Sequence, residues 1–242
     1  MPAGQSSGTY GFNLGNSEIV SEAFERIQMR PAMLDRHHLI SAQRSLNLEL
    51  VNFSNAGVNL WKVISGTINL VAGSGTYLFT GTNGLLTVTE VLYTQVNGGG
   101  AGINNDRWMR PMNRTDYAMI PNKLQPGTPT QFWFQRLIVP QITIWPVPQV
   151  GAVAPAYVIS WYGLQQIQDA GLGGGEIPDL VYRGLDALCA RLAHRLAIKF
   201  APPLVQARKA EADEAWELFV GNDQEMGAFI VRPNVSVYGR IR

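Results

Sequence analysis

The chain has 242 residues, of which 46% are hydrophobic and 15% are charged, so it can form a sizeable core and contains no apolar run of bilayer-spanning length. Its 19 basic and 18 acidic residues give a formal net charge of +1, which excludes the strong overall positive charge of a dedicated DNA-binding protein. Cys189 is the only cysteine, so an internal disulfide is excluded and we expect a buried, unreactive thiol.

Residues 1–16 are small, polar and rich in glycine, so we expect a flexible segment that orders only against a partner. The segment lacks the basic start and the apolar stretch of a secretion signal. We therefore expect a protein that is made and used in a cytoplasm and that does not bind a membrane.

The spacing of apolar residues predicts two helices within 17–57. The first has Asn16 or Ser17 as its N-cap and ends before Pro31, and the second is capped by Asp35 and ends near Gly57. One apolar stripe of the second helix consists of Leu39, Ala42, Leu46, Leu50 and Phe53.

Ile40, Leu48 and Val51 form another apolar stripe, on a different face of the second helix. A helix with two apolar faces must pack against two surfaces. In an isolated domain this predicts a fully buried helix, and in a ring the second face contacts the neighbouring subunit. Together with Trp216, these three residues are our candidates for a subunit interface.

Residues 58–165 consist of short β-branched and aromatic runs separated by Gly, Pro and Asn, a pattern typical of strands and turns. We expect an antiparallel, sandwich-like β region inserted between helices. Because Pro140, Pro146 and Pro148 bracket residues 141–145, we expect that strand at a sheet edge. The candidate strands are 59–64, 67–71, 76–79, 85–93, 131–137, 141–145 and 153–162.

Helical spacing returns in residues 177–221 and predicts one helix that starts at Pro178 and Asp179 and another that starts at Pro202. The expected fold class is therefore α+β, with a helical bundle built from the N- and C-terminal helices around the β insertion. We expect residues 222–242 to form an extended arm. From Ala228 onward this segment alternates partly and carries three Arg without an acidic residue, which suits it to adding a strand to another protein.

The sequence contains no recognisable catalytic constellation. His37 and His38 are adjacent, so on a helix they point about 100° apart and cannot chelate one metal ion. Neither glycine-rich loop is followed by the Lys-Ser/Thr pair of a phosphate-binding loop, and no paired carboxylates lie in an apolar setting. We expect no enzyme activity, no metal and no cofactor.

Six segments, taken together and in their order along the chain, form a recognisable pattern: SEIV at 17–20, SAQRSLNL at 41–48, NAGVNLW at 55–61, ITIWPVP at 142–148, IPDL at 177–180 and ALCARLA at 187–193. In this order they resemble the head-to-tail adaptor proteins of short-tailed bacteriophages, also called tail accessory factors or tail tubular protein A. The central β region is longer than in the mostly helical members of that family.

The resemblance implies a virion protein that forms a ring of twelve subunits beneath the portal, with tail nozzle or fibre proteins bound below. Genomic DNA would only pass through the channel, and a near-neutral chain is compatible with this because dense Lys and Arg would bind phosphates. The C-terminal arm would grip the portal. Its candidate portal-binding residues are Arg232, Val235, Val237, Tyr238, Arg240 and Arg242.

Two other functions stay open. The β region could be a receptor- or glycan-binding module that the helices link to a virion. An unrecognised cell-wall hydrolase is disfavoured because such enzymes need paired, environment-tuned carboxylates.

Overall fold

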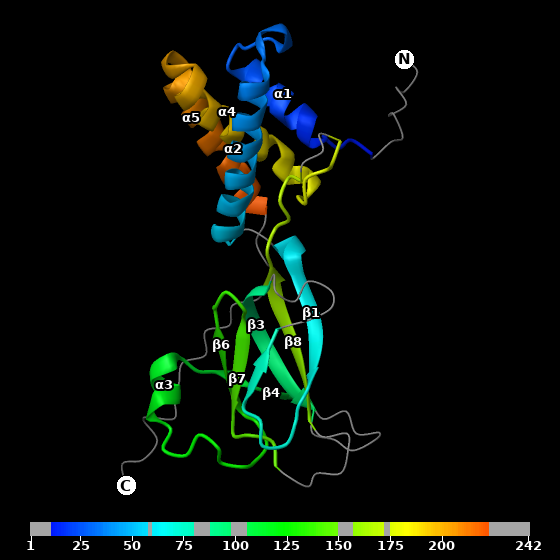
Figure 1. The fold of residues 1–242 in the computed structure, drawn as a ribbon, viewed down its shortest axis with the longest axis vertical. Coiled ribbons are helices and arrows are strands. Elements are labelled where there is room, and N and C mark those ends of the chain that lie inside the picture. The colour runs from blue at the N-terminus through cyan, green and yellow to red at the C-terminus, as the bar shows by residue number, and fades with distance from the viewer. Residues whose placement is uncertain are drawn as a thin grey trace, which may run out of the picture.

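The computed structural model describes residues 11–57, 60–79, 88–97, 106–149, 157–171 and 175–222. The four longer helices lie apart from the strands, and the helical part that they form is above the β part in Figure 1. Each part has its own hydrophobic core. The chain enters the β part after the second long helix and returns after the last strand, so the predicted α+β class is confirmed.

Four helices form the helical part, and α4 packs against the other three. The predicted apolar positions Ile19, Phe24, Leu46 and Phe53 are buried in its core together with the apolar face of α4. The helices are α1 (Asn16–Arg26), α2 (Arg36–Asn55), α4 (Leu185–Phe200) and α5 (Val205–Asn222), with 3-10 turns η1 (Pro31–Met33), η4 (Tyr182–Gly184) and η5 (Pro202–Leu204).

The N-termini of the first two helices depend on specific side chains. Asp35 caps α2 as predicted, because its carboxylate accepts a hydrogen bond from the backbone N–H of His38 at 3.0 Å. Asn16, assigned above to the flexible segment, is the first residue of α1, and its buried side chain donates to the carbonyl of Ala170 at 2.7 Å. Leu39 was expected in the buried stripe but is 47% exposed, because the buried stretch of α2 begins only at Ala42.

The predicted helix start at Pro178 and Asp179 is wrong, since α4 begins at Leu185 after η4. The Asp179 carboxylate instead accepts hydrogen bonds from Lys62 Nζ at 2.6 Å and from the backbone N–H of Gln168 at 3.0 Å. A contact between distant segments has replaced the local cap that the sequence suggested. This contact also ties the start of the β part to the returning chain.

Two four-stranded sheets face one another in the β part and share one core, in which Trp161 of β8 lies with Phe132, Ile142 and Ile144 of the other sheet. All the strand pairs are antiparallel except β5 with β6. One sheet has the order β1 (Val63–Asn69), β8 (Val158–Gln165), β3 (Val88–Asn97), β4 (Asp106–Trp108), and the other β2 (Thr76–Leu78), β7 (Gln141–Trp145), β6 (Gln131–Gln135), β5 (Arg110–Pro111).

Two of the expectations for the strands are wrong. The candidate strands 59–64 and 67–71 are replaced by the turn η2 (Leu60–Lys62) and the single strand β1, which runs through Gly66. The strand β7 is not at an edge but lies between β2 and β6. The prolines flank β7 without interrupting it, so every residue of the strand keeps its N–H, whereas the edge strand β5 contains Pro111. The short helix α3 (Arg114–Met119) was not predicted.

Candidate subunit-interaction surface

Three of the predicted interface residues lie together on the side of α2 that faces away from the core. Ile40, Leu48 and Val51 are 47%, 48% and 46% exposed, while Ala42, Leu46, Leu50 and Phe53 on the other side are buried. Arg44 lies four residues from both Ile40 and Leu48, so it projects from the same side. We call these four residues the α2 outer face. The expectation of a fully buried helix is therefore wrong, because the second apolar stripe has no cover within the described residues.

The surface beside the α2 outer face is hollowed rather than flat. One hollow is lined by Ile40, Gln43, Arg44, Asn47, Leu48, Asp169 and Gly171, and an adjoining one by Asn47, Leu50, Val51 and residues 165–169. Gln43 donates to the carbonyl of Gly171 at 2.6 Å, and Asn47 accepts from the N–H of Ala170 at 2.7 Å. These bonds hold the returning segment along α2 and fix the shape of the hollows.

A buried carboxylate orients α2 on α4. The side chain of Glu49 is 4% exposed and forms ion pairs with Arg191, at 3.1 Å, and with Arg195. The Arg191 guanidinium in turn lies over the ring of Trp216, 4.4 Å from its centroid. Because Glu49 is on the side of α2 opposite Arg44, this network turns the α2 outer face towards solvent.

Trp216 does not lie with the other three interface candidates. Its ring is partly buried and packs against Phe53, with ring centroids 4.8 Å apart, and against Phe219 at 5.7 Å. The predicted set is therefore divided between an exposed face and the margin of the core. Whether any of the four contacts another subunit stays a prediction.

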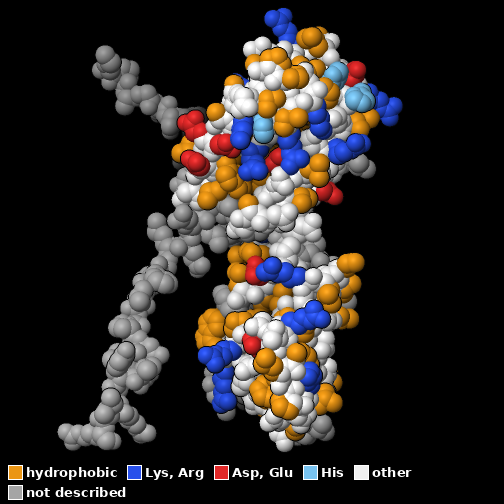
Figure 2. Space-filling view, turned by 90° about the vertical axis from the view of Figure 1, so that its left-hand side faces the viewer, with side chains coloured by type: hydrophobic (Ala, Val, Ile, Leu, Met, Phe, Trp, Pro, Cys, Tyr) orange, Lys and Arg blue, Asp and Glu red, His pale blue; other side chains and the backbone are white. Residues whose placement is uncertain are grey.

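Positive charge gathers where α4 approaches α2. Lys199 donates to the hydroxyls of Ser41 and Ser45 at 3.1 and 2.6 Å. Burial lowers the pKa of Lys199, and the nearby charges of Arg44 and Arg195 lower it further. Figure 2 shows Lys, Arg and His side chains gathered over this side of the helical part, with several Asp and Glu near its left edge.

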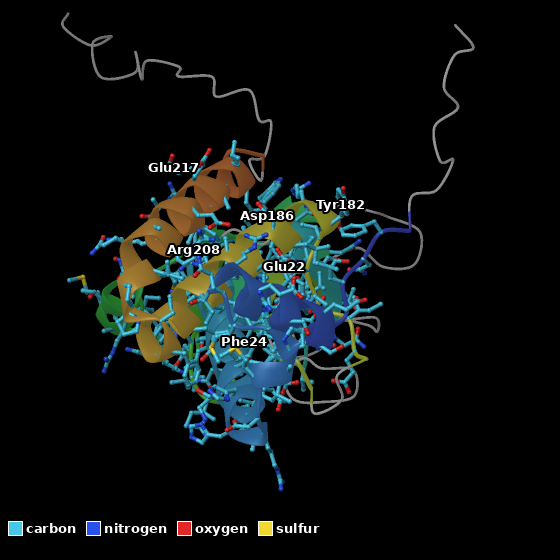
Figure 3. The ribbon with its side chains drawn as sticks, turned by 90° about the horizontal axis from the view of Figure 1, so that it is seen from above. Glu22, Phe24, Tyr182, Asp186, Arg208 and Glu217 are labelled. Atoms are coloured by element: carbon cyan, nitrogen blue, oxygen red, sulfur yellow. The ribbon has the colours of Figure 1, made fainter. Side chains whose placement is uncertain are left out.

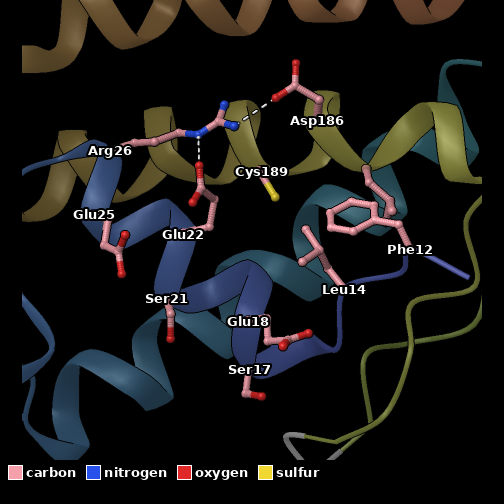
Figure 4. Close-up of a pocket in the computed structure, with 11 residues that line it drawn as sticks. Phe12, Leu14, Ser17, Glu18, Ser21, Glu22, Glu25, Arg26, Asp186 and Cys189 are labelled. Atoms are coloured by element: carbon pink, nitrogen blue, oxygen red, sulfur yellow. Dashed lines mark hydrogen bonds and ion pairs between the residues drawn. The ribbon is translucent and has the colours of Figure 1, made fainter. Parts of the chain in front are cut away.

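A third hollow lies between α1 and α4, and its charge is opposite to that of the surface between α2 and α4. Glu22 and Asp186 lie on the same side of the bundle in Figure 3, and Figure 4 shows the hollow itself. Arg26 contacts Glu22 and Asp186 at 2.8 Å each and Glu211 at 3.0 Å. We call this region the α1–α4 hollow. Its lining residues are Phe12, Leu14, Ser17, Glu18, Ser21, Glu22, Glu25, Arg26, Leu185, Asp186 and Cys189.

The α1–α4 hollow was not among the sites expected from the sequence. The available signal was the spacing of Glu18, Glu22 and Glu25, which puts all three on the solvent side of α1. The wall of the hollow that α4 contributes could not be predicted from local sequence, because it depends on how two helices distant in the sequence pack together.

The thiol of Cys189 is buried as predicted. Burial raises its pKa to about 12, and the neighbouring carboxylates of Glu22 and Asp186 add to this against the opposing charge of Arg26. The thiolate, which is the nucleophilic form, is therefore scarce at neutral pH. His38 is used in packing, with its ring 4.8 Å from that of Phe200. In the part of the chain that the structure describes, no group of three or more His, Cys, Asp and Glu residues is arranged to hold a metal ion.

The six candidate portal-binding residues, Arg232 to Arg242, lie outside the described residues. The same is true of most of the expected arm, since the description ends at Asn222, the last residue of α5.

Within the described ranges, none of the helices combines the length and the hydropathy needed to cross a bilayer. Comparison with protein-family models and with curated protein sequences gives no match to this chain.

Proposed function

We propose that the chain is a structural virion protein, a ring-forming head-to-tail adaptor that docks beneath the portal, extends the DNA channel and provides the attachment site for nozzle or fibre proteins. The observation that supports this most is the α2 outer face. Three large apolar side chains are each nearly half exposed, although the helical core is complete without them. Contiguous exposed apolar surface on a folded protein is typical of a contact with another protein.

The division into two parts is consistent with the same role. The helical part carries both the α2 outer face and the α1–α4 hollow, so contacts between copies would form there. The β part would then be available to bind other proteins of the particle. The portal as partner and the count of twelve subunits rest on the resemblance of the sequence segments described above.

Binding to purified portal rings tests the proposal. We expect electron microscopy of portal rings mixed with the chain to reveal added density at one pole of the ring. Leu48→Asp should reduce the number of copies bound to each portal ring, because the contact between neighbouring copies would then bury a carboxylate without a partner. The matched control is Leu124→Asp in the β part, where Leu124 is 70% exposed, and it should bind as the unaltered chain does.

One observation favours the glycan-binding alternative. Trp108 on β4 is 64% exposed and is paired with Gln95 on β3, which is paired with Ser160 on β8. Directly opposed residues share a face of a sheet, so Trp108 lies on the same outward face as Tyr162, two residues from Ser160. Exposed aromatic rings on a sheet can stack on sugars. Binding of the full chain to a glycan array, lost in Trp108→Ala, would support this alternative over the adaptor role.

A further inference from the structure

The α2 outer face carries a cation in the middle of apolar side chains. Arg44 is exposed between Ile40 and Leu48, and among the described residues no carboxylate forms an ion pair with it. A surface that covers Ile40 and Leu48 would also remove water from Arg44. It must therefore offer a carboxylate beside apolar side chains, because an unpaired buried charge is strongly unfavourable.

A symmetric contact between two α2 outer faces does not satisfy this requirement. It would bring Arg44 against a second Arg44, and Arg195 and Lys199 already place further positive charge nearby. Like charges brought together at an interface oppose association. Asp169 lines the hollow beside this face, but one carboxylate leaves the face net positive, so the stronger complement to Arg44 lies elsewhere on the partner.

The α1–α4 hollow has the required chemistry. It combines four carboxylates with the apolar side chains of Phe12, Leu14 and Leu185. Arg26 already pairs with the carboxylates of Glu22 and Asp186. Glu18 accepts only the N–H of Gly15, and Glu25 has no cation beside it among the residues that the structure places. Two carboxylates of the hollow can thus accept a guanidinium from outside.

We propose that a second copy of this chain is the partner, and that the α2 outer face of one copy docks on the α1–α4 hollow of the next. In this contact Arg44 lies beside Glu18 and Glu25 of the neighbouring copy, while Ile40 and Leu48 cover its Phe12 and Leu14. The two surfaces share no residue, so a pair of copies keeps one α2 outer face and one α1–α4 hollow free. Such a head-to-tail contact continues from copy to copy and closes into a ring where the rotation permits. The inference rests on the proposed ring-forming role and names the surfaces that would form the ring.

Charge reversal with exchange of partners tests the contact. In sedimentation velocity at low ionic strength and high protein concentration, the full chain should self-associate, and added salt should weaken the association. Arg44→Glu and Glu25→Arg should each weaken it by at least about tenfold, because each variant places like charges in contact. A mixture of the two variants should associate again, since a contact between one variant and the other joins opposite charges at positions 44 and 25.

Two matched controls keep the test specific. Arg114→Glu on α3 and Glu214→Arg on α5 make the same charge changes at exposed positions outside both surfaces and should leave self-association unchanged. Circular dichroism of every variant shows whether it is folded. A chain that stays monomeric at every concentration, an Arg44→Glu variant that associates normally, or a mixture that fails to recover would each overturn the proposed contact.

The failure of this contact is distinguishable from the failure of the adaptor role. Portal binding is measured separately, on portal rings with the unaltered chain. Portal binding by a chain whose copies do not pair through Arg44 would remove the contact and leave the adaptor role standing. Self-association with recovery in the mixed variants, but without portal binding, would retain the contact and remove the adaptor role.

Discussion

Replacing Glu49 by Gln should destabilise the helical part by removing the charge that joins α2 to α4. The side chain of Glu49 is 4% exposed and pairs with Arg191 and Arg195, whose side chains are 27% and 29% exposed. Removing one partner of a fully buried ion pair costs about 3–5 kcal/mol. Because water can still reach both guanidinium groups and Gln can still accept a hydrogen bond, we expect a smaller loss of about 1–3 kcal/mol.

Thermal unfolding followed by the helical circular dichroism signal measures this loss. At roughly 2–4 °C per kcal/mol for a domain of this size, the Tm should fall by about 2–12 °C. The control is Glu217→Gln, at an exposed position of α5, which should change stability by no more than about 0.5 kcal/mol. If Glu49→Gln were as stable as the control, the ion-pair network would not be what orients α2.

Three further changes test other parts of the structure. Gly163→Ala would place a Cβ atom 2.6 Å from the backbone oxygen of Glu90, so it should destabilise the β part by about 1–3 kcal/mol in denaturant unfolding; unchanged stability would contradict the close approach of β3 and β8. Burial holds the pKa of Cys189 at about 12, above its ordinary 9.0, so its stabilising contribution is complete below pH 9.0 and lost as the pH rises towards 12. The difference in unfolding free energy between the unaltered chain and Cys189→Ala should therefore shrink over this range, by up to about 1.4 kcal/mol per pH unit, and a pH-independent difference would refute it. Lys62→Met removes the 2.6 Å contact to Asp179 and should cost about 1–2 kcal/mol in urea unfolding, whereas an unchanged midpoint would show that this contact does not stabilise the junction.

The helices were predictable where local spacing determines burial. The spacing of Ala42, Leu46, Leu50 and Phe53 fixes which side of α2 faces the core. It follows that the residues on the other side, such as Leu48, are exposed unless something else covers them. Sequence reasoning thus found the α2 outer face but could not say whether the chain itself covers it.

The errors arose where contacts between distant segments override local patterns. Asp179 has the sequence context of a helix cap, but its carboxylate binds Lys62. Gly66 lies between the predicted strands 59–64 and 67–71, yet it is part of β1, where the absence of a side chain leaves room for the ring of Trp161: a Cβ atom would come within 2.7 Å of that ring. Trp216, a candidate for the subunit interface, is partly buried because its ring packs on Phe53, and whether it also contacts another subunit stays a prediction. None of these partners is visible in the sequence around the residue concerned.

The proposed ring depends on one contact, in which the α2 outer face of each copy packs on the neighbouring copy. The most direct measurement is cryo-electron microscopy of portal rings saturated with the chain, at a resolution that traces α2. We expect a closed ring in which α1 and α4 of one copy cover Ile40, Arg44 and Leu48 of the next. A ring whose α2 outer faces are open to solvent, or portal rings that stay bare at saturating protein, would contradict it.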